Sequence, residues 1–269
     1  MSVEYVTSSP RIALIGAGSG PLIIFMHGIG GGKENWIEQI PAFAGEFHAV
    51  AWDARGYGHS DDYEGPCRFE DFAADVVRII DFYGARKAHL IGLSMGGRIA
   101  QHCYFRAPDR VASLTLCDTQ MTFENRSDAD REAFLASRRA PLLAGKTTRD
   151  IAPAVIGSLV APNASKRALD QAMETMGQLR TENYLKTMEA VLREPIAGDF
   201  SKIDVPVHVV VGELDKLTPP PISEDIARRI PGARFSIIPG AGHLSNIEEP
   251  HAFNLAALEF VRDVERSQA

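Results

Sequence analysis

Apolar and polar positions along this chain follow two patterns, one typical of buried strands and one typical of helices. Short continuous apolar runs, of the kind that form buried strands, lie at 11–15, 22–26, 47–52, 90–93, 111–116, 205–211 and 234–238. Segments in which apolar residues recur at helical spacing lie at 33–43, 69–83, 98–106, 223–230 and 249–264. Strands that alternate with helices predict a mostly parallel, doubly wound α/β sheet that is covered on both faces.

The pattern changes between Asp118 and Ser201, where no run typical of strands is found. Helix-like segments lie there at 128–139, 165–179 and 181–193, in a region punctuated by Pro141, Gly145, Pro153, Pro162 and Pro195. We interpret residues 119–200 as a helical lid inserted into one α/β domain, which consists of residues 1–118 and 201–269. Five lid side chains are candidates to line a pocket, although such residues at helical spacing are more often ordinary core: Met173, Met176, Leu179, Tyr184 and Met188.

A glycine-rich segment, Gly16 to Pro21, joins the first two apolar runs and invites comparison with a dinucleotide-binding loop. The motif G-x-G-x-x-G would need its third glycine at position 21, which is Pro21, and a helix after it, where another strand follows. We therefore interpret this segment as a hairpin turn.

Composition and charge narrow the range of partners. The chain has 269 residues, of which 45% are hydrophobic and 23% charged, as in an ordinary globular protein. The net charge of −7 includes no basic cluster, which argues against nucleic acid or an anionic membrane surface as a partner. The three cysteines, Cys67, Cys103 and Cys117, form no CxxC pair, so neither a disulfide framework nor a zinc site is indicated. No signal-peptide pattern and no apolar run of about 18 residues is found, so we expect a cytoplasmic location; a homo-oligomer stays open.

The strongest chemical signal is the pattern G-x-S-x-G at Gly92, Ser94 and Gly96. An apolar run precedes it and a helix-like segment follows it, which is the strand–turn–helix context that the motif requires. A serine on so tight a turn adopts strained backbone angles, and glycine at the flanking positions avoids collisions with the neighbouring strand and helix. The hydroxyl then stands above the N-terminus of the next helix, whose amides can face a developing negative charge. Ser94 is therefore the candidate nucleophile.

Two loops that follow strands carry further polar groups. The segment His27–Gly32 is a glycine-rich loop directly after a strand. A backbone N–H of such a loop can donate a hydrogen bond to an oxyanion, and Ile29 is the candidate donor. His27 itself is interpreted as a structural hydrogen-bonding residue. In the loop after the third apolar run, Asp53 and Arg55 are interpreted as an ion pair that pins the loop.

A serine hydroxyl needs a base within hydrogen-bond reach. Of the eight histidines, only His243 lies in a glycine-rich loop after the last strand. The base in turn needs a carboxylate to fix its tautomer, and Asp215 is favoured over Asp118, which follows the preceding strand. Ser94, Ile29, Asp215 and His243 all lie just past the ends of strands, where parallel sheets gather their ligands.

The order Ser94, Asp215, His243 is that of the α/β-hydrolases, and the chain resembles that superfamily over nearly its whole length outside the lid. Within it, Gly92-Leu93-Ser94-Met95-Gly96-Gly97 and Gly242-His243-Leu244-Ser245-Asn246-Ile247-Glu248 resemble the 3-oxoadipate enol-lactonase branch. The segments Asp53-Ala54-Arg55-Gly56 and Asp215…Thr218-Pro219-Pro220 also fit that branch.

The resemblance implies a Ser-His-Asp hydrolase of small lactones or esters that uses neither cofactor nor metal. It assigns the triad to Ser94, Asp215 and His243, and the oxyanion hole to the amides of Ile29 and Met95. Serine at position 94 argues against haloalkane dehalogenases and epoxide hydrolases, which attack with a carboxylate. Three alternatives stay open: C–C bond hydrolases of ring-cleavage products keep the same triad, perhydrolases share the Gly-x-Ser-Met-Gly-Gly turn, and a ligand receptor could retain the fold without catalysis.

Overall fold

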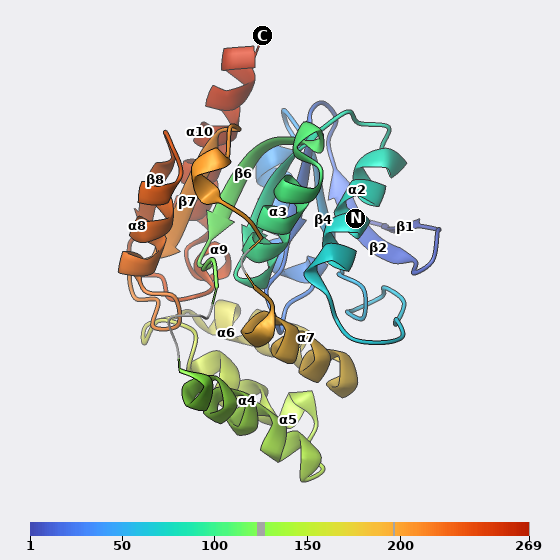
Figure 1. Ribbon diagram of the computed structural model, residues 1–269, viewed down its shortest axis with the longest axis vertical. Helices are drawn as coiled ribbons and strands as arrows, with labels where there is room; N and C mark the ends of the chain where they lie inside the picture. The colour runs from blue at the N-terminus through green and yellow to red at the C-terminus, as the bar shows by residue number, and fades with distance from the viewer. Residues whose placement is uncertain (123–126, 196, 269) are drawn as a thin grey trace.

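The computed structural model describes residues 1–122, 127–195 and 197–268, and its centre is an eight-stranded sheet. The strands are β1 (Val3–Val6), β2 (Ile12–Ala17), β3 (Leu22–Met26), β4 (His48–Trp52), β5 (Ala88–Leu93), β6 (Val111–Cys117), β7 (Val207–Gly212) and β8 (Arg234–Ile238). Their order in the sheet is β1-β2-β4-β3-β5-β6-β7-β8 (Figure 1). All pairs from β4 to β8 are parallel, whereas β1 and β2 form an antiparallel edge. The predicted mostly parallel α/β sheet is confirmed.

The interpretation of Gly16–Pro21 as a hairpin turn is wrong. β2 and β3 are not neighbours, because β4 lies between them and pairs with both. The connection instead crosses the beginning of β4: a Cβ at Gly18 would meet the Phe47 carbonyl oxygen at 2.2 Å, and Gly18 has a φ of +87°. The glycines therefore serve a close crossing of two backbones. The real hairpin partner of β2 is β1, a four-residue edge strand too short to give a clear pattern.

Helices cover both faces of the sheet. On one face lie α2 (Phe69–Phe82), α3 (Met95–Arg106) and α8 (Pro220–Arg229), whose apolar residues share a core with the strands. On the other face, α1 (Gln39–Phe43) and α10 (Pro250–Gln268) bury a second, smaller core around Phe25, Phe43 and Phe253. In place of the single helix expected at 33–43, a 3-10 turn (Lys33–Trp36) precedes α1. This break places Pro41 in the first turn of α1, where its missing N–H is not needed.

In the described residues between β6 and β7 lie four α-helices, α4 (Asp128–Leu143), α5 (Thr148–Gly157), α6 (Lys166–Gly177) and α7 (Thr181–Arg193), and a 3-10 turn at Phe200–Lys202. Figure 1 shows the four α-helices grouped together beyond one end of the sheet. Two of the prolines expected to punctuate this region, Pro141 and Pro153, lie inside helices. α5 begins at a capping box in which Thr147 and Asp150 exchange side-chain and backbone hydrogen bonds, and the Thr-x-x-Asp spacing is the signal of this helix start in the sequence.

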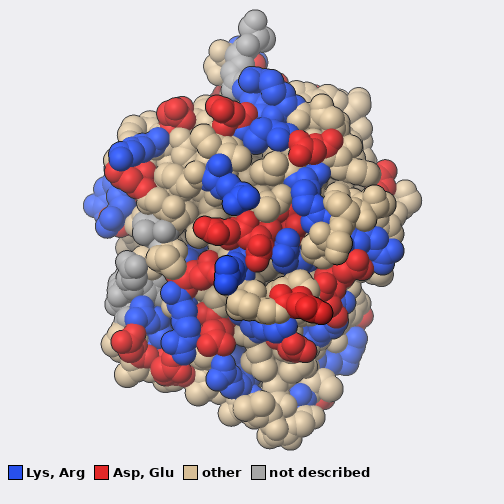
Figure 2. Space-filling model, turned by 45° about the vertical axis from the view of Figure 1, so that its right-hand side comes forward, with Lys and Arg blue, Asp and Glu red and all other residues tan. Residues whose placement is uncertain are grey.

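Charged side chains of both signs are intermixed on the face of the molecule that Figure 2 shows. Many charged side chains of the described residues form ion pairs, such as Arg180 with Asp62 at 2.6 Å. Within the described residues, no helix combines the length and apolar character needed to cross a bilayer.

Candidate active site

Ser94 occupies the tight turn between β5 and α3. Its φ of +55° is unusual for a residue with a side chain, as expected for a strained turn. The flanking glycines are required by packing: a Cβ at Gly92 would meet the Gly96 carbonyl oxygen at 2.2 Å, and a Cβ at Gly96 would meet the Met26 carbonyl oxygen at 2.1 Å. The Ser94 N–H donates to the carbonyl of Cys117 at 2.8 Å, which ties the turn to the end of β6.

The structure brings together the three side chains selected from the sequence. His243, in the loop after β8, places Nε2 3.0 Å from Ser94 Oγ and Nδ1 2.8 Å from Asp215 Oδ2. His243 is only 2% exposed and Asp215 only 3%. Nδ1 facing a carboxylate carries the proton, so Nε2 is free to accept one from the serine hydroxyl. Such a chain of bonds is the arrangement that activates a serine.

The Asp215 carboxylate is held by its own loop. Oδ1 accepts hydrogen bonds from the N–H groups of Leu217 at 2.8 Å and Thr218 at 3.0 Å, and Oδ2 accepts one from the Thr218 hydroxyl at 2.6 Å. Thr218 was not selected from the sequence as a positioning residue. The D-x-x-T spacing after a strand was the available signal, since a short polar side chain there can return to the aspartate.

The pKa values of the pair move in opposite directions. Burial disfavours the charged form of His243, but the Asp215 carboxylate outweighs this effect and, with Asp118 and Glu248, raises the pKa of His243 above 6.5. Burial likewise disfavours the charged Asp215, but His243, Thr218 and their hydrogen bonds outweigh it and lower the pKa of that carboxyl. The pair is therefore built to stabilise an imidazolium beside a carboxylate.

Asp118, the rival acid, follows β6 and makes different contacts. Its Oδ1 accepts a hydrogen bond from the Gly212 N–H at 2.7 Å, and its Oδ2 accepts one from the Ser245 hydroxyl. The side chain is fully buried, and burial together with the neighbouring Asp215 raises its pKa to about 8. Asp118 thus supports the loops around the site, whereas Asp215 contacts the imidazole directly.

The two amides expected to receive an oxyanion belong to residues that line one cavity with Ser94 and His243, namely Ile29 and Met95. The loop that carries Ile29 runs very close to the nucleophile, because a Cβ at Gly28 would lie 3.1 Å from the Ser94 Cβ. The loop turns back on itself through a hydrogen bond from the Gly31 N–H to the Gly28 carbonyl at 3.1 Å. Glycine at position 28 therefore permits the approach that an oxyanion donor needs.

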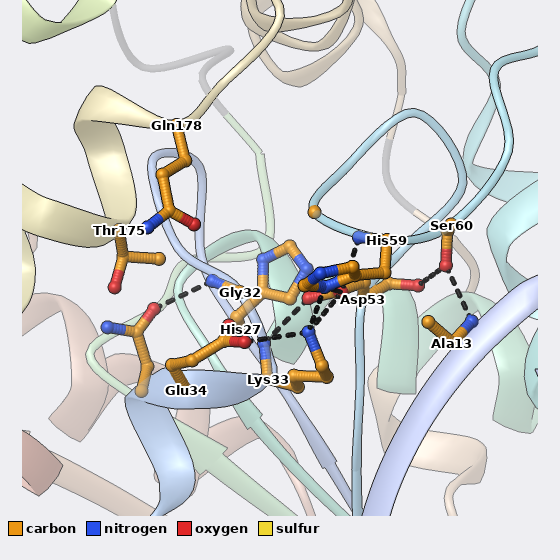
Figure 3. Close-up of polar contacts among 12 residues, drawn as sticks. Ala13, His27, Gly32, Lys33, Glu34, Asp53, His59, Ser60, Thr175 and Gln178 are labelled. Carbon is orange, nitrogen blue, oxygen red and sulfur yellow. Dashed lines mark hydrogen bonds and ion pairs between the residues drawn. The ribbon is translucent and has the colours of Figure 1, made fainter. Parts of the chain in front are cut away.

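A buried lysine anchors this loop (Figure 3). Lys33 is 1% exposed, and its Nζ donates to Asp53 Oδ2 and Glu34 Oε1 at 2.7 Å each and to His59 Nδ1 at 2.8 Å. The Lys33 N–H donates to the other Asp53 oxygen at 2.9 Å. No motif in the sequence marks Lys33, because only the fold brings the two loops together.

The interpretation of Asp53 and Arg55 as an ion pair is wrong. Asp53 pairs with Lys33, while Arg55 makes a bidentate pair with Asp75 of α2 at 2.7 and 2.9 Å. The chain turns directly after β4, with the Tyr57 N–H donating to the Ala54 carbonyl at 2.9 Å, so Arg55 lies toward α2 and away from Asp53. His27 has both ring nitrogens engaged by backbone, with Nδ1 2.8 Å from the Gly28 carbonyl and Nε2 accepting from the Ala54 N–H at 3.1 Å, as a structural histidine would.

The cavity above Ser94 is walled partly by the helices that follow β6. The helices contribute Phe134, Arg138, Val155, Tyr184, Met188, Val191 and Leu192, and the connection after α5 contributes Leu159. Of the five side chains considered as pocket candidates, Tyr184 and Met188 line this cavity. Met173, Met176 and Leu179 are not among its described lining, and Met176 is fully buried. No cluster of three His, Cys, Asp or Glu side chains able to hold a metal occurs in the described ranges.

The family model described as alpha/beta hydrolase fold matches residues 21–250, and the chain belongs to this family. Among curated relatives, 3-oxoadipate enol-lactonase 2 of Acinetobacter baylyi is 26% identical over 250 residues, which covers 91% of this chain and 90% of the relative. A non-heme bromoperoxidase named BpoC from Mycobacterium tuberculosis, described as putative, is 29% identical over 258 residues, covering 92% and 96%.

Solved structures agree with this placement. The enol-lactonase of Burkholderia xenovorans LB400 has a TM-score of 0.85 at 25% identity and covers 96% of this chain and 100% of its own. A thermophilic esterase of Thermogutta terrifontis, solved with malate bound, has a TM-score of 0.88 at 27% identity, covering 98% and 99%. The predicted α/β-hydrolase fold, the resemblance to enol-lactonases and the assignment to the hydrolase class of enzymes are confirmed.

Proposed function

We propose that this protein hydrolyses a small lactone or carboxylic ester through a Ser94–His243–Asp215 triad. The observation that carries the proposal is the continuous chain of contacts from Asp215 Oδ2 through both ring nitrogens of His243 to Ser94 Oγ, at 2.8 and 3.0 Å. The similarity to enol-lactonases and an esterase supports the choice of substrate class. We further propose that residues 119–200, with α4–α7, act as the lid over this site.

The reaction proceeds in two halves. Ser94 Oγ attacks the carbonyl carbon while His243 Nε2 takes the hydroxyl proton, and the amides of Ile29 and Met95 receive the oxyanion. The tetrahedral intermediate then breaks its bond to the leaving oxygen, which takes the proton from His243. In the second half, water attacks the acyl-enzyme, His243 accepts the proton of the water, and Ser94 is released with that proton.

Two polar side chains of the cavity lining, Gln120 and Arg138, indicate what the substrate carries at its far end. Gln120 is 6% exposed, and its Nε2 has no hydrogen-bond partner among the described residues. Arg138 lines the same cavity, where its guanidinium donates a long hydrogen bond, 3.4 Å, to the Ser158 hydroxyl and lies 5.3 Å from the centre of the Phe134 ring. Among the described residues it forms no ion pair. Amide and guanidinium N–H groups in a cavity lining suit a substrate carboxylate. We therefore propose a lactone or ester that bears a second, free carboxylate.

The substrate class can be tested with purified protein. Turnover should be compared on a carboxylate-bearing enol-lactone, neutral aryl esters and a ring-fission diketone. Fast hydrolysis of the lactone or esters supports the proposal. Cleavage of the diketone alone would replace it with C–C bond hydrolysis.

Replacing Arg138 with glutamine should raise KM for the half-ester of a dicarboxylic acid about tenfold, because a hydrogen bond to a charged group contributes about 1.5 kcal/mol. KM for the corresponding neutral diester should stay unchanged. Arg139→Gln is the matched control, since Arg139 faces Glu189 at 3.7 Å on the surface and is outside the cavity lining. An equal rise in KM for charged and neutral esters would show that Arg138 does not bind the substrate carboxylate.

The rate should fall on the acid side of neutrality. His243 must be neutral to accept the serine proton, and its pKa is raised above 6.5. The acid limb of kcat/KM for a neutral ester should therefore have its midpoint above this value, with activity lost as the pH falls through it. A profile that remains flat down to about pH 5 would argue against His243 as the base.

A further inference from the structure

Glu248, at the end of the short helix α9 (Ser245–Glu248), is a buried carboxylate held by backbone amides. It is 6% exposed. Its Oε1 accepts a hydrogen bond from the Leu244 N–H at 3.0 Å, and its Oε2 accepts two, from Gly242 at 3.0 Å and Ala161 at 2.7 Å. Within the described ranges no lysine or arginine lies at ion-pair distance from it, so three amide groups compensate its charge.

These three amides belong to two separate parts of the chain. Gly242 and Leu244 flank His243 directly, whereas Ala161 lies in the connection between α5 and α6. The same connection makes a second bond, because the His243 N–H donates to the Leu159 carbonyl at 2.9 Å. The backbone on either side of the imidazole is therefore bonded to Glu248, and the backbone of His243 itself to the connection.

The His243 loop and the α5–α6 connection are packed backbone against backbone at Gly242. A Cβ at Gly242 would meet the Ala161 nitrogen at 2.6 Å and the Leu159 carbonyl oxygen at 2.7 Å, so only glycine allows the two segments to lie this close. If the connection between α5 and α6 moved, Glu248 would lose the bond from the Ala161 N–H, and the His243 N–H would lose the Leu159 carbonyl as its acceptor. Gly242 would also lose the backbone against which it packs. The position of the imidazole thus depends on a segment 82 residues away in sequence (243 − 161).

We propose that Glu248 is a positioning residue that joins the α5–α6 connection and the His243 loop into one unit, and so keeps the imidazole in line with Ser94. This inference rests on the proposed role of His243 as the base. Glu248 touches no reacting atom and acts only through the loop backbone and its charge. The titratable groups that act on His243 are Asp215 from the loop after β7, Asp118 from the end of β6, and Glu248 from α9.

Glu248→Gln tests both parts of this role. The amide places an NH₂ group against backbone N–H donors, so the loop must shift, and kcat should fall on the order of 10- to 100-fold with KM nearly unchanged, because misplacement by about 1 Å can cost about 10²-fold. The variant also lacks a negative charge that raises the pKa of His243, so the acid limb of the pH–rate profile should move to lower pH. If Glu248 only stabilised the fold, the variant would have a lower melting temperature, but the acid limb of its pH–rate profile would not move.

Two further variants separate geometry from charge. Glu248→Asp keeps the charge but shortens the reach, so it should lose kcat while the acid limb stays near that of the unaltered protein. Glu249→Gln is the matched control, since Glu249 is the next residue and is exposed; it should change neither property. Unaltered kcat in a folded Glu248→Gln, or in Glu248→Asp if the glutamine variant does not fold, would overturn the proposal.

Hydrogen exchange tests the coupling without any substrate. In Glu248→Gln, and in Glu248→Asp to a smaller extent, the amides of residues 159–161 and 242–244 should exchange faster together, while those of β5 remain protected. Loss of protection in only one of the two segments would contradict the joint unit. If these amides respond as expected but no ester or lactone is turned over, the proposed function fails while the structural coupling stands.

Discussion

Ser94→Ala is expected to remain folded and to lose hydrolytic activity by a factor on the order of 10⁶, because the variant has no nucleophile for acyl transfer. The backbone strain at position 94 is the same for alanine as for serine, so the melting temperature should change little. The measurement is turnover of an aryl ester, together with labelling by a fluorophosphonate, which should attach to Ser94 in the unaltered protein and fail to attach in the variant.

The chain offers a matched control for this experiment. Ser113 in β6 also contacts a histidine and, through it, a carboxylate: its Oγ is 2.8 Å from His89 Nδ1, and His89 Nε2 is 3.1 Å from Glu265. Ser113 is fully buried, so no substrate can reach it. Ser113→Ala should therefore keep its activity. Turnover that survived in Ser94→Ala would show that the geometry at Ser94 has been assigned the wrong role.

Asp215→Asn should reduce kcat about 10⁴-fold, because an amide in place of the carboxylate favours the wrong tautomer of His243 and no longer stabilises the imidazolium. Asp118→Asn should cost far less. The pKa of Asp118 is raised to about 8, so loss of its charge changes little at pH 7. Asparagine can keep a hydrogen bond to each partner, because its Oδ1 accepts from the Gly212 N–H and its Nδ2 can donate to Ser245 Oγ, in place of the bond that the Ser245 hydroxyl donates to Asp118. Asparagine also tolerates the φ of +44° found there.

Kinetics of the two variants side by side decide which aspartate is the acid of the triad. A larger loss in Asp118→Asn than in Asp215→Asn would reverse the assignment. Thermal unfolding of both variants should be measured as well. A loss of kcat that is accompanied by a lower melting temperature reflects impaired folding and not the loss of the partner of His243.

The residues around Ser94 could be predicted because their signals are local. The glycine spacing at 92–96, the loop position of His243 and the strand-end position of Asp215 can each be recognised within about ten residues of sequence. The existence of most strands could be predicted from equally local signals, since mainly apolar runs mark β2 to β7.

What could not be predicted depends on contacts between distant segments. The pairing of β2 with β4 in place of β3 is set by the crossing at Gly18, and the ion pair of Lys33 with Asp53 joins two loops that periodicity does not relate. Glu248 lies in the motif at 242–248, yet its bond to the Ala161 N–H spans 87 positions. Such bonds become visible only when the sheet is assembled, because the sequence pattern reports burial and not partners.

The positive φ at Ser94 restricts which hydroxyl amino acid can serve as nucleophile. Threonine carries the same functional group, but its second γ substituent makes the left-handed side of conformational space far more costly for it than for an unbranched residue. Cysteine and aspartate, which are unbranched at Cβ, fit the same turn. Exchange of chemistry on this scaffold is thus open to thiols and carboxylates and closed to the closest chemical relative of serine.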